Sequence, residues 1–365
     1  MVRVLKENLV KALGAVKPAI PSKATLPVLT HVGLRTEKDL LVVMGTDLET
    51  FVEASIHCKA DESEVEICVP SATFSQYVAA LSDEVLFLES TEHKLTVTQG
   101  ENTAEFPGIP YTEFPLIPPV PEDNKIELDS ATLGYAFHSV LHSAGTDVGR
   151  AVLTGVFIKH DGNELTTVCA DGFRMAVTSL EVEADAFQMI VPATGVQIAL
   201  KNVPEGEAVL MWDDVRVAFD LPFDGNIKTK VYCQTIQGNY VNYKQIIPEK
   251  ANSFTVARDG LIDSLKRCNV FAGQEANVVH FTPSGYRLTL EGRASDAGEG
   301  VEKVGIDYSG EEITFALNGT YAIDALSTCD DVVTVEVTAP NRPIVVSSER
   351  DTHLCVLMPM AIRNK

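Results

Sequence analysis

The sequence repeats itself three times, and this repetition limits the possible folds more than any other feature. Three segments align: "ICVPSATFSQYVAALSDEVLFLES" begins at residue 67, "MIVPATGVQIALKNVPEGEAVLMWDD" at 189 and "TFALNGTYAIDALSTCDDVVTVEVT" at 314. Each pattern predicts a short strand, a Pro or Asn, a helix of about three turns, an acidic turn and an alternating strand. Pro70, Pro192 and Asn318 stand at equivalent places. Repeated segments predict repeated supersecondary units, so we expect three domains of one architecture.

A second set of aligned segments supports the same division. "VLKENLVKALGAV", "ELDSATLGYAFHSV" and "TVARDGLIDSLKRC" each predict a strand followed by an amphipathic helix, with Leu9, Leu133 and Leu261 at equivalent positions. In the second of these helices, Leu133 and Phe137 fall on one face, together with Val140 and Leu141.

Each repeat therefore contains two helices and about eight strands, which predicts an α+β fold with helices gathered on one side of antiparallel sheets. Proline clusters mark linkers at residues 114–125 and 246–253. The predicted domains are residues 1–121, 122–248 and 249–365.

Composition excludes several classes of protein. The chain has 365 residues, of which 45% are hydrophobic, enough to form a core in each domain. No run of about eighteen apolar residues occurs, as a spanning helix would need. Charged residues such as Arg3, Lys6, Glu7 and Lys11 interrupt the apolar residues of the amino terminus, so we expect neither a signal peptide nor a membrane segment and assign the chain to the cytoplasm.

No cofactor, metal site or disulfide is expected. The seven cysteines are scattered through apolar strings without a CxxC pair, which favours buried thiols in a reducing compartment. His138 and His142 are four residues apart on a predicted helix, but no third ligand is indicated. They lie opposite the apolar stripe, so we expect a solvated helix face.

The stretch "TVCADGFRMAVTSL" (residues 167–180) places Arg174 directly after an Asp-Gly turn. Cys169, Asp171 and Arg174 could form a nucleophile, an acid and an anion clamp, as in a hydrolase or transferase. The surrounding residues alternate with period two, however, which favours a hairpin whose turn is Asp-Gly. The first repeat has a counterpart, "MGTDLETF", with Glu49 where Arg174 stands. No P-loop, GxSxG, HExxH or complete GxGxxG motif appears.

The acidic balance bears on possible partners. The chain carries 29 Lys and Arg against 51 Asp and Glu, a net charge of −22. Because tight nucleic-acid binding needs a basic surface, this charge alone counts against it.

The complete set of patterns nevertheless resembles one family. The linker endings "EFPLIP" and "NYVNYKQIIP", the phrases "TLPVL", "GTDLE" and "ADGFR", and the terminal "VLMPM" are similar to the DNA polymerase III beta subunit, the bacterial sliding clamp family. The resemblance covers the whole chain. It implies three clamp-fold domains in a crescent, two crescents closing head-to-tail into a ring, and a non-catalytic processivity factor that encircles duplex DNA.

The resemblance also implies partners. These are double-stranded DNA, held topologically and without sequence preference, a DNA polymerase, an ATP-dependent clamp loader, repair proteins with clamp-binding peptides, and a second copy of the chain as a homodimer. Topological holding removes the charge objection, because strong phosphate contacts would impede sliding. A diverged scaffold that keeps the peptide groove but has little DNA role is the alternative.

By the same resemblance, the hairpin belongs to a groove that takes partner peptides. We expect exposed Leu, Val and Met side chains to form it and Arg174 to bond the peptide at its rim. The "VLMPM" segment has no obvious core role, although a final edge strand is the alternative. Tyr240 and Val241 stand where the family often has Phe-Pro, and Phe173 replaces a common His. The groove residues are Leu153, Gly172, Phe173, Arg174, Met175, Ile246, Asn318, Tyr321, Val356, Leu357, Met358, Pro359 and Met360.

Two further surfaces follow from the ring. The DNA-facing candidates are Lys11, Lys23, Lys201, Lys266 and Arg267. This supply is thin, because the helix "ATFSQYVAAL" has no basic residue and the second-domain helix offers only His138 and His142. The dimer-interface candidates are Phe106, Val270 and Phe271.

Overall fold

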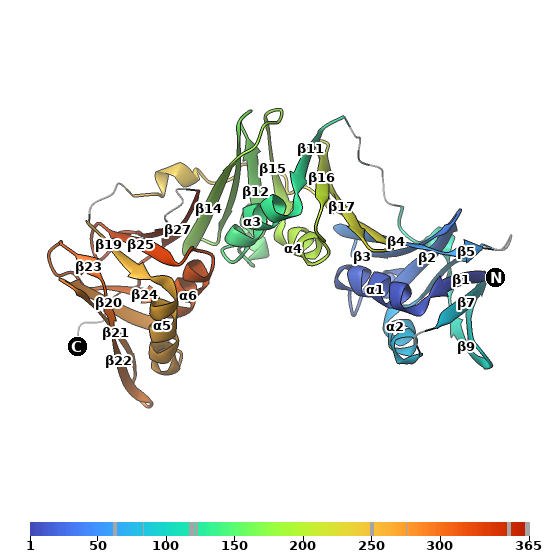
Figure 1. The fold of residues 1–365 in the computed structure, drawn as a ribbon, viewed down its shortest axis with the longest axis horizontal. Helices are drawn as coiled ribbons and strands as arrows, with labels where there is room; N and C mark the ends of the chain where they lie inside the picture. Colours follow the sequence, from blue (N-terminus) through green and yellow to red (C-terminus); the bar gives the residue numbers. More distant parts are fainter. Residues whose placement is uncertain are drawn as a thin grey trace. The chain divides into compact units, whose positions relative to one another are not determined.

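The computed structural model describes residues 1–60, 64–82, 84–116, 120, 123–248, 252–274, 276–348 and 352–361. These residues form two compact units (Figure 1). Unit 1 comprises Met1–Gly134 and Thr194–Thr235, and unit 2 comprises Tyr135–Ala193 and Ile236–Lys365. Residues 121, 122 and 249, where the predicted domains meet, lie outside the described residues, so the exact boundaries of the predicted domains stay a prediction.

Unit 1 contains two sheets, and all of the strand pairs described in them are antiparallel. The five-stranded sheet has the order β5 (Lys59–Ala60), β1 (Val2–Leu5), β7 (Val85–Thr91), β8 (Lys94–Gln99), β9 (Asn102–Pro107). The nine-stranded sheet has the order β10 (Ile109–Pro110), β6 (Glu66–Pro70), β2 (His31–Glu37), β3 (Leu40–Thr46), β4 (Thr50–His57), β18 (Ile227–Gln234), β17 (Arg216–Asp224), β16 (Glu207–Trp212), β11 (Lys125–Asp129).

Unit 2 repeats this plan with a nine-stranded and a four-stranded sheet, again antiparallel. The larger sheet has the order β15 (Phe187–Pro192), β12 (Gly155–His160), β13 (Glu164–Ala170), β14 (Arg174–Glu181), β27 (His353–Leu357), β26 (Ile344–Ser348), β25 (Val332–Val337), β19 (Asn252–Ala257), β23 (Asp307–Tyr308). The smaller sheet has the order β22 (Gly298–Gly305), β21 (Arg287–Ala294), β20 (Val278–Ser284), β24 (Phe315–Asn318).

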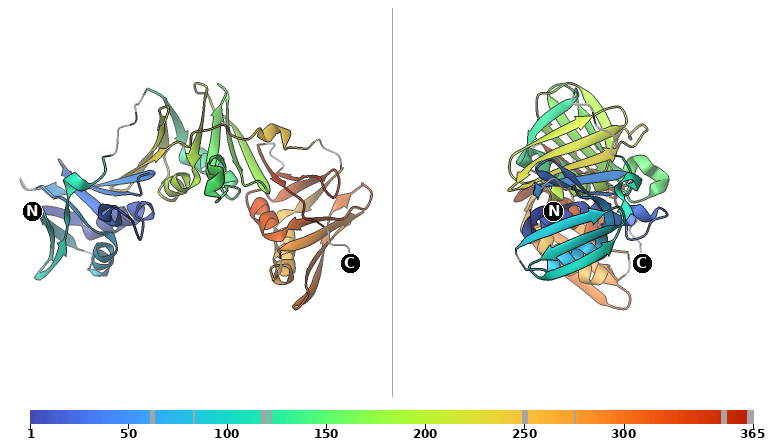
Figure 2. Two further views of the ribbon diagram at one scale, coloured as in Figure 1. Left: turned by 180° about the vertical axis from the view of Figure 1, so that it is seen from behind. Right: turned by 90° about the vertical axis from the view of Figure 1, so that its right-hand side faces the viewer.

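The α-helices of the described residues follow the repeats, with two in each repeat. They are α1 (Lys6–Val16), α2 (Ser71–Ala80), α3 (Ser130–Leu141), α4 (Ala193–Lys201), α5 (Arg258–Ala272) and α6 (Gly319–Ser327). The helices α1 and α2 lie side by side in unit 1, as α5 and α6 do in unit 2 (Figures 1 and 2). Leu9, Leu133 and Leu261 are all buried, as the aligned apolar stripes predict.

The residue before the second helix of each repeat explains where that helix begins. Pro70, Pro192 and Asn318 each end a strand, and α2, α4 and α6 begin at the next residue. A Pro or Asn at this place ends the strand ladder and suits the first turn of a helix. The equivalence inferred from the sequence is therefore confirmed.

Strand β27 occupies the middle of its sheet, which contradicts the edge-strand alternative for the "VLMPM" segment. Met175 pairs with Val356 on one side of the strand, and Val345 pairs with Val356 on the other. Neighbouring strands therefore pair with both edges of β27. The side chains of Val356 and Leu357 are also buried, so these two are core residues.

The remaining expectations about the whole chain concern cysteines and membranes. All seven cysteines are free and buried, as the sequence predicts. Burial raises the pKa of the Cys68 thiol to about 12 and that of Cys329 to about 11, because an apolar interior disfavours the thiolate. Among the described residues, no helix has both the length and the apolar character that crossing a membrane requires.

Candidate functional site

The turn between β13 and β14 is held by the side chain of Asp171. Its Oδ1 atom accepts hydrogen bonds from the backbone N–H groups of Phe173 (2.7 Å) and Arg174 (2.9 Å). The N–H of Asp171 donates to the carbonyl of Arg174, and Gly172 has a φ of +93°, which glycine adopts without strain. The predicted hairpin is confirmed, and Arg174 is the first residue of its second strand.

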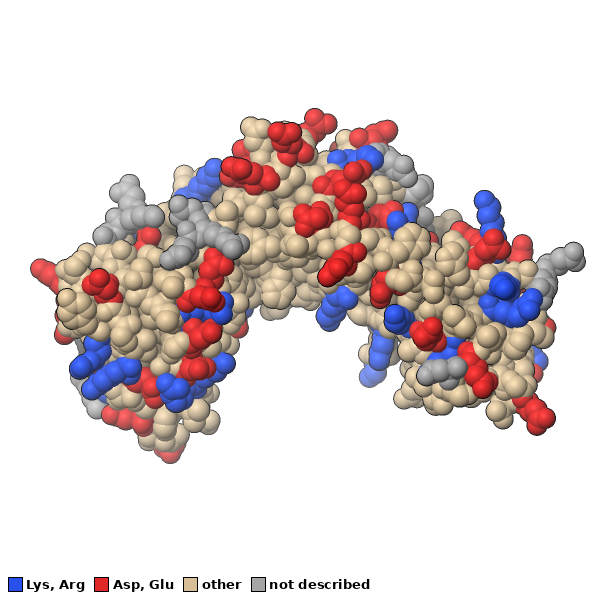
Figure 3. Space-filling view, viewed as in Figure 1, with Lys and Arg blue, Asp and Glu red and all other residues tan. Residues whose placement is uncertain are grey.

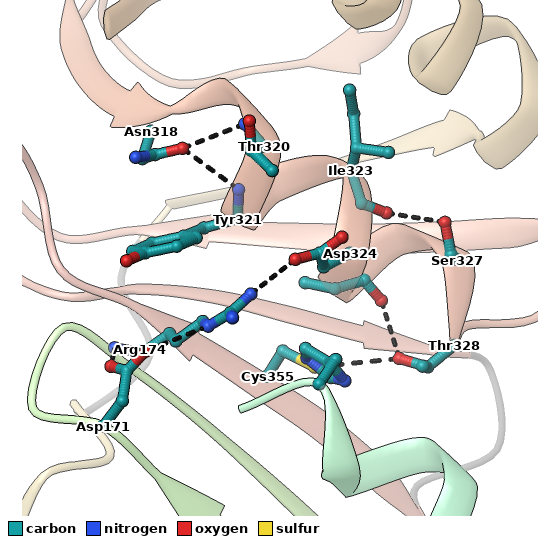
Figure 4. Close-up of polar contacts among 12 residues, drawn as sticks. Asp171, Arg174, Asn318, Thr320, Tyr321, Ile323, Asp324, Ser327, Thr328 and Cys355 are labelled. Carbon is teal, nitrogen blue, oxygen red and sulfur yellow. Dashed lines mark hydrogen bonds and ion pairs between the residues drawn. The ribbon is translucent and has the colours of Figure 1, made fainter. Parts of the chain in front are cut away.

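Arg174 is held by three partners inside unit 2, and its side chain is only 13% exposed. Its Nε donates to Asp171 Oδ2 at 3.1 Å, and its Nη1 donates to Asp324 Oδ2 at 2.6 Å. The guanidinium carbon lies 4.1 Å from the centre of the Tyr321 ring, a cation–π contact. Figure 4 shows the side chain reaching from the hairpin turn to α6. A nearly buried guanidinium requires such pairing, because an unpaired charge there would be costly.

Helix α6 presents these partners because its first turn is fixed. The side-chain oxygen of Asn318 accepts from the N–H groups of Thr320 and Tyr321, a regular N-cap (Figure 4). Tyr321 and Asp324 are three residues apart, so they lie on the same helix face toward Arg174. The side-chain oxygen of Asn318 is therefore occupied by the cap of α6.

An apolar cluster lies beneath the hairpin. Leu153, Met175 and Val356 belong to one buried cluster with Val168, Ala170, Val177, Tyr243 and Val345. Tyr240 and Ile247 pack against it, and Tyr240 stacks on Phe157 with ring centres 4.9 Å apart. Leu153, Met175, Val356 and Leu357 are therefore core residues, and the expectation that such side chains are exposed is wrong for them.

Other apolar side chains of the predicted set are exposed. Phe173 is 61% exposed, Met358 is 42% exposed, and Ile246 is also exposed. The N–H of Met358 donates to the carbonyl of Phe173 at 2.9 Å, so these two side chains project from adjacent backbone. Pro359 and Met360 are partly buried, and the N–H of Met360 donates to Ala316 at 2.7 Å. Backbone bonds thus fix the "MPM" residues beside the hairpin.

We call the thirteen predicted residues the candidate peptide site. Sequence reasoning missed several residues that complete it, namely Asp324, Tyr243, Ile247 and Arg150. A Cβ on Gly172 would lie 2.7 Å from Nη1 of Arg150, so the Arg150 guanidinium covers the turn. Asp324 could have been found from its position three residues after Tyr321, whereas Arg150 lies in the 3₁₀ segment Val148–Thr154, for which the sequence offers no signal.

Unit 1 contains an equivalent turn, between β3 and β4, and it corrects one assignment. Asp47 Oδ1 accepts from the N–H groups of Glu49 and Thr50, and the Asp47 N–H donates to the Thr50 carbonyl. Thr50 therefore occupies the place of Arg174, and Glu49 occupies that of Phe173. The prediction that Glu49 is the counterpart of Arg174 is wrong by one residue.

The remaining counterparts in unit 1 lack the polar set of unit 2. The N–H of Gln234 donates to Glu49, as that of Met358 donates to Phe173. Counted from Pro192 and Asn318, Gly195 stands in the place of Tyr321 and buried Ile198 in that of Asp324. A Cβ on Gly195 would collide with the sulfur of Cys233, so no larger side chain fits there. The Arg174–Asp324–Tyr321 arrangement thus distinguishes unit 2 from the equivalent part of unit 1.

The hydrolase alternative finds no support in the surroundings of Cys169. This thiol is fully buried, and burial raises its pKa far above the ordinary value. Its sulfur lies 4.0 Å from the carbonyl oxygen of Gly155, the limit of a thiol hydrogen bond. Asp171 and Arg174 are occupied with the turn and with α6. A nucleophile needs an accessible thiolate, which this position denies.

His138 and His142 differ from each other, which corrects the expectation of one solvated helix face. His138 is exposed, as predicted. Helix α3 ends at Leu141, so His142 lies in the following turn and points into unit 2 toward Cys355, with Nε2 and Sγ 3.7 Å apart. Among the described residues, no group of three or more His, Cys, Asp or Glu is arranged to hold a metal ion.

The basic candidates are exposed, but acidic neighbours offset most of them. Lys11 lies 3.9 Å from Asp224, and Lys266 lies 3.8 Å from Asp263. Arg267 donates to Glu302 at 2.8 Å. Lys23 and Lys201 are also exposed. Figure 3 shows basic side chains interspersed with acidic ones on the face that it presents.

The dimer candidates differ in exposure. Val270 is 65% exposed near the end of α5, and Phe271 is partly buried with its ring close to Gly300 on β22. Phe106 is buried inside unit 1, where its ring packs edge-on against Phe74 at 5.3 Å. Phe106 lies on β9, an edge strand of its sheet, and β22 is an edge strand of another.

Comparisons with known proteins cover nearly the whole chain. Residues 1–118, 127–242 and 244–361 match the models for the N-terminal, central and C-terminal domains of the DNA polymerase III beta subunit. A beta sliding clamp of Chlamydia pneumoniae is 26% identical over 98% of this chain and 97% of its own length. A beta sliding clamp of Synechocystis is 28% identical over 93% of each chain.

Solved structures share the fold. The DNA polymerase III beta subunit of Thermotoga maritima superposes with a TM-score of 0.90 at 24% identity, covering 99% of both chains. The DNA polymerase sliding clamp of Bacillus subtilis gives a TM-score of 0.91 at 20% identity, with the same coverage. The predicted clamp fold, an α+β architecture repeated in three domains, is confirmed.

Proposed function

Since the chain belongs to the DNA polymerase III beta subunit family, it is a DNA sliding clamp without catalytic activity, and we propose that it holds its partners at the candidate peptide site of unit 2. As a clamp, the protein acts as a processivity factor in replication, with DNA, a polymerase and a second copy of the chain as its partners.

One observation carries the proposal for the site. Of the two equivalent turns, the one in unit 2 joins a nearly buried arginine to α6 and places exposed Phe173 and Met358 on adjacent backbone. The buried cluster supports the backbone below this surface, so the turn itself needs little ordering when a ligand binds. Exposed apolar side chains bordered by charged ones suit a short peptide with apolar anchors.

The ligand is a short peptide with a glutamine, a leucine and an aromatic residue at its end. Phe173 and Met358 provide apolar contact for the leucine and the aromatic ring. The Asp324 carboxylate is 37% exposed and can accept a hydrogen bond from the glutamine amide. A small surface of this kind supports binding in roughly the micromolar range.

The test uses a labelled peptide of this composition and the full-length protein. We expect saturable binding that competes with an unlabelled copy and that is lost in Met358→Glu. Unchanged binding in that variant would refute the assignment of the site. The matched control is Val215→Glu, because Val215 is an exposed apolar residue in the Asp213–Arg216 turn of unit 1.

For the DNA surface, we propose that Lys11, Lys23, Lys201, Lys266 and Arg267 face the duplex. Their contribution is weak, since Asp224, Asp263 and Glu302 lie within ion-pair distance of three of them. Weak contact suits a protein that must slide, because each strong phosphate contact would add a barrier. Retention on circular DNA distinguishes a clamp from a scaffold that has little DNA role.

For the ring, we propose that the two copies join head-to-tail through the region of Val270 and Phe271 and the edge of the sheet that contains Phe106. Within the described part of the chain, β9 and β22 are edge strands, whose outer backbone groups can continue a sheet into another chain. Phe106 is part of β9 and supports this edge from inside, since its ring packs against Phe74. A heterologous contact that closes upon itself makes a ring.

The remaining partners follow from the same site. We propose that an ATP-dependent clamp loader and repair proteins carry peptides of the class described above and compete for it. We also propose that the domains end at residues 121 and 248 and that the protein acts in the cytoplasm. Competition between two partner peptides for one copy of the protein tests the shared site.

A further inference from the structure

A chain of buried polar groups runs through unit 2 beside the candidate peptide site. Ser139 on α3 bonds Thr178 on β14 at 2.7 Å, and Thr178 bonds Nδ1 of His353 on β27 at 2.8 Å. Nε2 of His353 bonds the hydroxyl of Thr328, just after α6, at 2.9 Å. One histidine thus connects three separate segments that carry residues of the peptide site.

A second histidine lies next to the first across a cysteine. The sulfur of Cys355 is 3.4 Å from Nε2 of His353 and 3.7 Å from Nε2 of His142. Nδ1 of His142 is buried as well. Two imidazoles and a thiol, none of them used by the clamp function as described, are therefore packed together.

Neutral His353 carries one ring proton and bonds a hydroxyl with each ring nitrogen. The Ser139 hydroxyl, next along this chain, donates to the carbonyl of Tyr135 at 2.6 Å. One ring nitrogen of His353 therefore donates and the other accepts, and the hydroxyls of Thr178 and Thr328 can turn to suit either placement of the proton. The Thr328 hydroxyl also lies 2.8 Å from the carbonyl of Ala325, to which it can turn when His353 gains a second proton.

The surrounding charges oppose such protonation. Burial lowers the pKa of His142 to about 4, and the charges of Arg174 and His353 lower it further, whereas Asp324 raises it. Burial also lowers the pKa of His353 to about 4, against smaller raising effects of the Val177 backbone and Asp330. Cys355 between them is neutral, since burial raises its pKa. Both histidines are therefore uncharged at neutral pH.

We propose that His142 and His353, packed around Cys355, form a proton-sensitive element that loosens the candidate peptide site when the pH falls. This inference rests on the proposed function of that site. A charged His142 repels Arg174 and attracts Asp324, and so competes for the carboxylate that Arg174 Nη1 binds at 2.6 Å. A charged His353 adds positive charge between β14, β27 and α6. Both changes weaken the contacts that hold β14, β27 and α6 together at the candidate peptide site.

The direction with pH follows from linkage. Each pKa is depressed in the folded protein, so a state in which the imidazole reaches water binds more protons. The free energy that each uncharged histidine contributes to the ordered state is fully present above about pH 6.5 and is lost as the pH falls toward about 4. Between pH 7 and pH 5, the ratio of loosened to ordered protein rises by about 20-fold for each histidine.

The experiment measures the affinity of the dimer for a capped peptide without titratable groups, made of glutamine, leucine and phenylalanine, at pH 7.5 and pH 5.0. Wild type should lose affinity at pH 5.0, and more than the double variant, with the rise in the ratio of loosened to ordered protein as the upper limit of the loss. The double variant His142→Gln/His353→Gln should lose less than about threefold, since glutamine keeps polar groups there but does not titrate. His138→Gln, a change at an exposed histidine of α3, should behave as wild type.

Equal losses in wild type and in the double variant would overturn the inference, as would an unchanged wild-type affinity. Circular dichroism at pH 7.5 checks that the variants fold, and His353→Gln alone serves if the double variant does not. Amide exchange of residues 319–327 and 353–357 provides an independent readout, with faster exchange at pH 5.0, after correction for intrinsic rates, only where the histidines are present. If the peptide binds at neither pH, the proposed function fails, while unchanged exchange at pH 5.0 would still refute the proton-sensitive element.

Discussion

Nη1 of Arg174 donates to Oδ2 of Asp324 at 2.6 Å, and this bond joins a hairpin turn to a helix that begins about 150 residues later in the chain. Because the arginine is nearly buried, it acts on the candidate peptide site mainly through the position of its partners. The carboxylate is the more exposed member of the pair.

Replacing Arg174 with alanine should weaken peptide binding by about 1 to 2 kcal/mol, because the turn and α6 lose their charged hydrogen bonds. Isothermal titration measures the change. Asp324→Asn should cost a similar amount, and the double variant should cost less than the sum, since both changes break one interaction. Arg216→Ala is the matched control, because Arg216 donates from Nε to Asp213 in another turn of unit 1, as Arg174 does to Asp171. A strictly additive double variant would contradict the positioning role.

Met358→Glu should abolish peptide binding while the dimer stays intact. The side chain is exposed beside Phe173, so a carboxylate there needs no burial in the free protein but must be desolvated against an apolar ligand. Fluorescence anisotropy reports the binding, and light scattering reports the dimer. Loss of both together would mean that Met358 supports the fold.

Val270→Glu should shift the protein from dimer to monomer. Val270 is 65% exposed in a single copy, which is the exposure expected of an apolar residue that a second copy covers. Sedimentation velocity over a dilution series measures the dissociation. Leu116→Glu, at another exposed apolar position, should leave the dimer unchanged. If the Val270→Glu dimer were as stable as the wild-type dimer, the interface would lie elsewhere.

Clamp loaded on nicked circular DNA should survive a moderate salt wash and leave when the circle is cut. A threaded ring does not depend on phosphate contacts, whereas a groove binder is lost as salt rises. Lys201→Glu should change retention on circles little. Equal loss from circular and linear DNA would favour a scaffold with little DNA role.

Thiol reagents should leave the native protein almost unmodified and label seven cysteines after denaturation. All seven are buried, and burial raises the pKa of Cys233 to about 12, so little thiolate is present at neutral pH. A colorimetric thiol assay measures both states. Rapid modification of Cys169 in the folded protein would reopen the catalytic interpretation of the hairpin.

Features that depend on neighbouring residues could be predicted from the sequence. Local geometry and comparison of the repeats made three features predictable: the Asp-Gly turn, the apolar stripe of Leu133, and the equivalent places of Pro70, Pro192 and Asn318. The set of residues near Arg174 followed from a resemblance, and the structure brings most of them together.

Features that depend on distant pairing could not be predicted. The segment "VLMPM" is apolar throughout, which suits an edge strand and a central strand alike, so the sequence could not show that Val356 pairs with both β14 and β26. His142 falls on the helix pattern, but α3 ends one residue earlier and the side chain turns inward. The pairing of Arg174 with Asp324 joins distant segments, and no local pattern specifies it.

The place of β27 between β14 and β26 has a consequence for how the protein is made. Strand β14 ends at Glu181, and its neighbour on that side begins at His353, so a chain emerging from the ribosome exposes one side of β14 until residues 353–357 have been translated. An unpaired strand flanked by apolar residues is a template for aggregation and a target for proteases. Chains cut short before this segment should therefore be removed by quality control before they could assemble into defective rings.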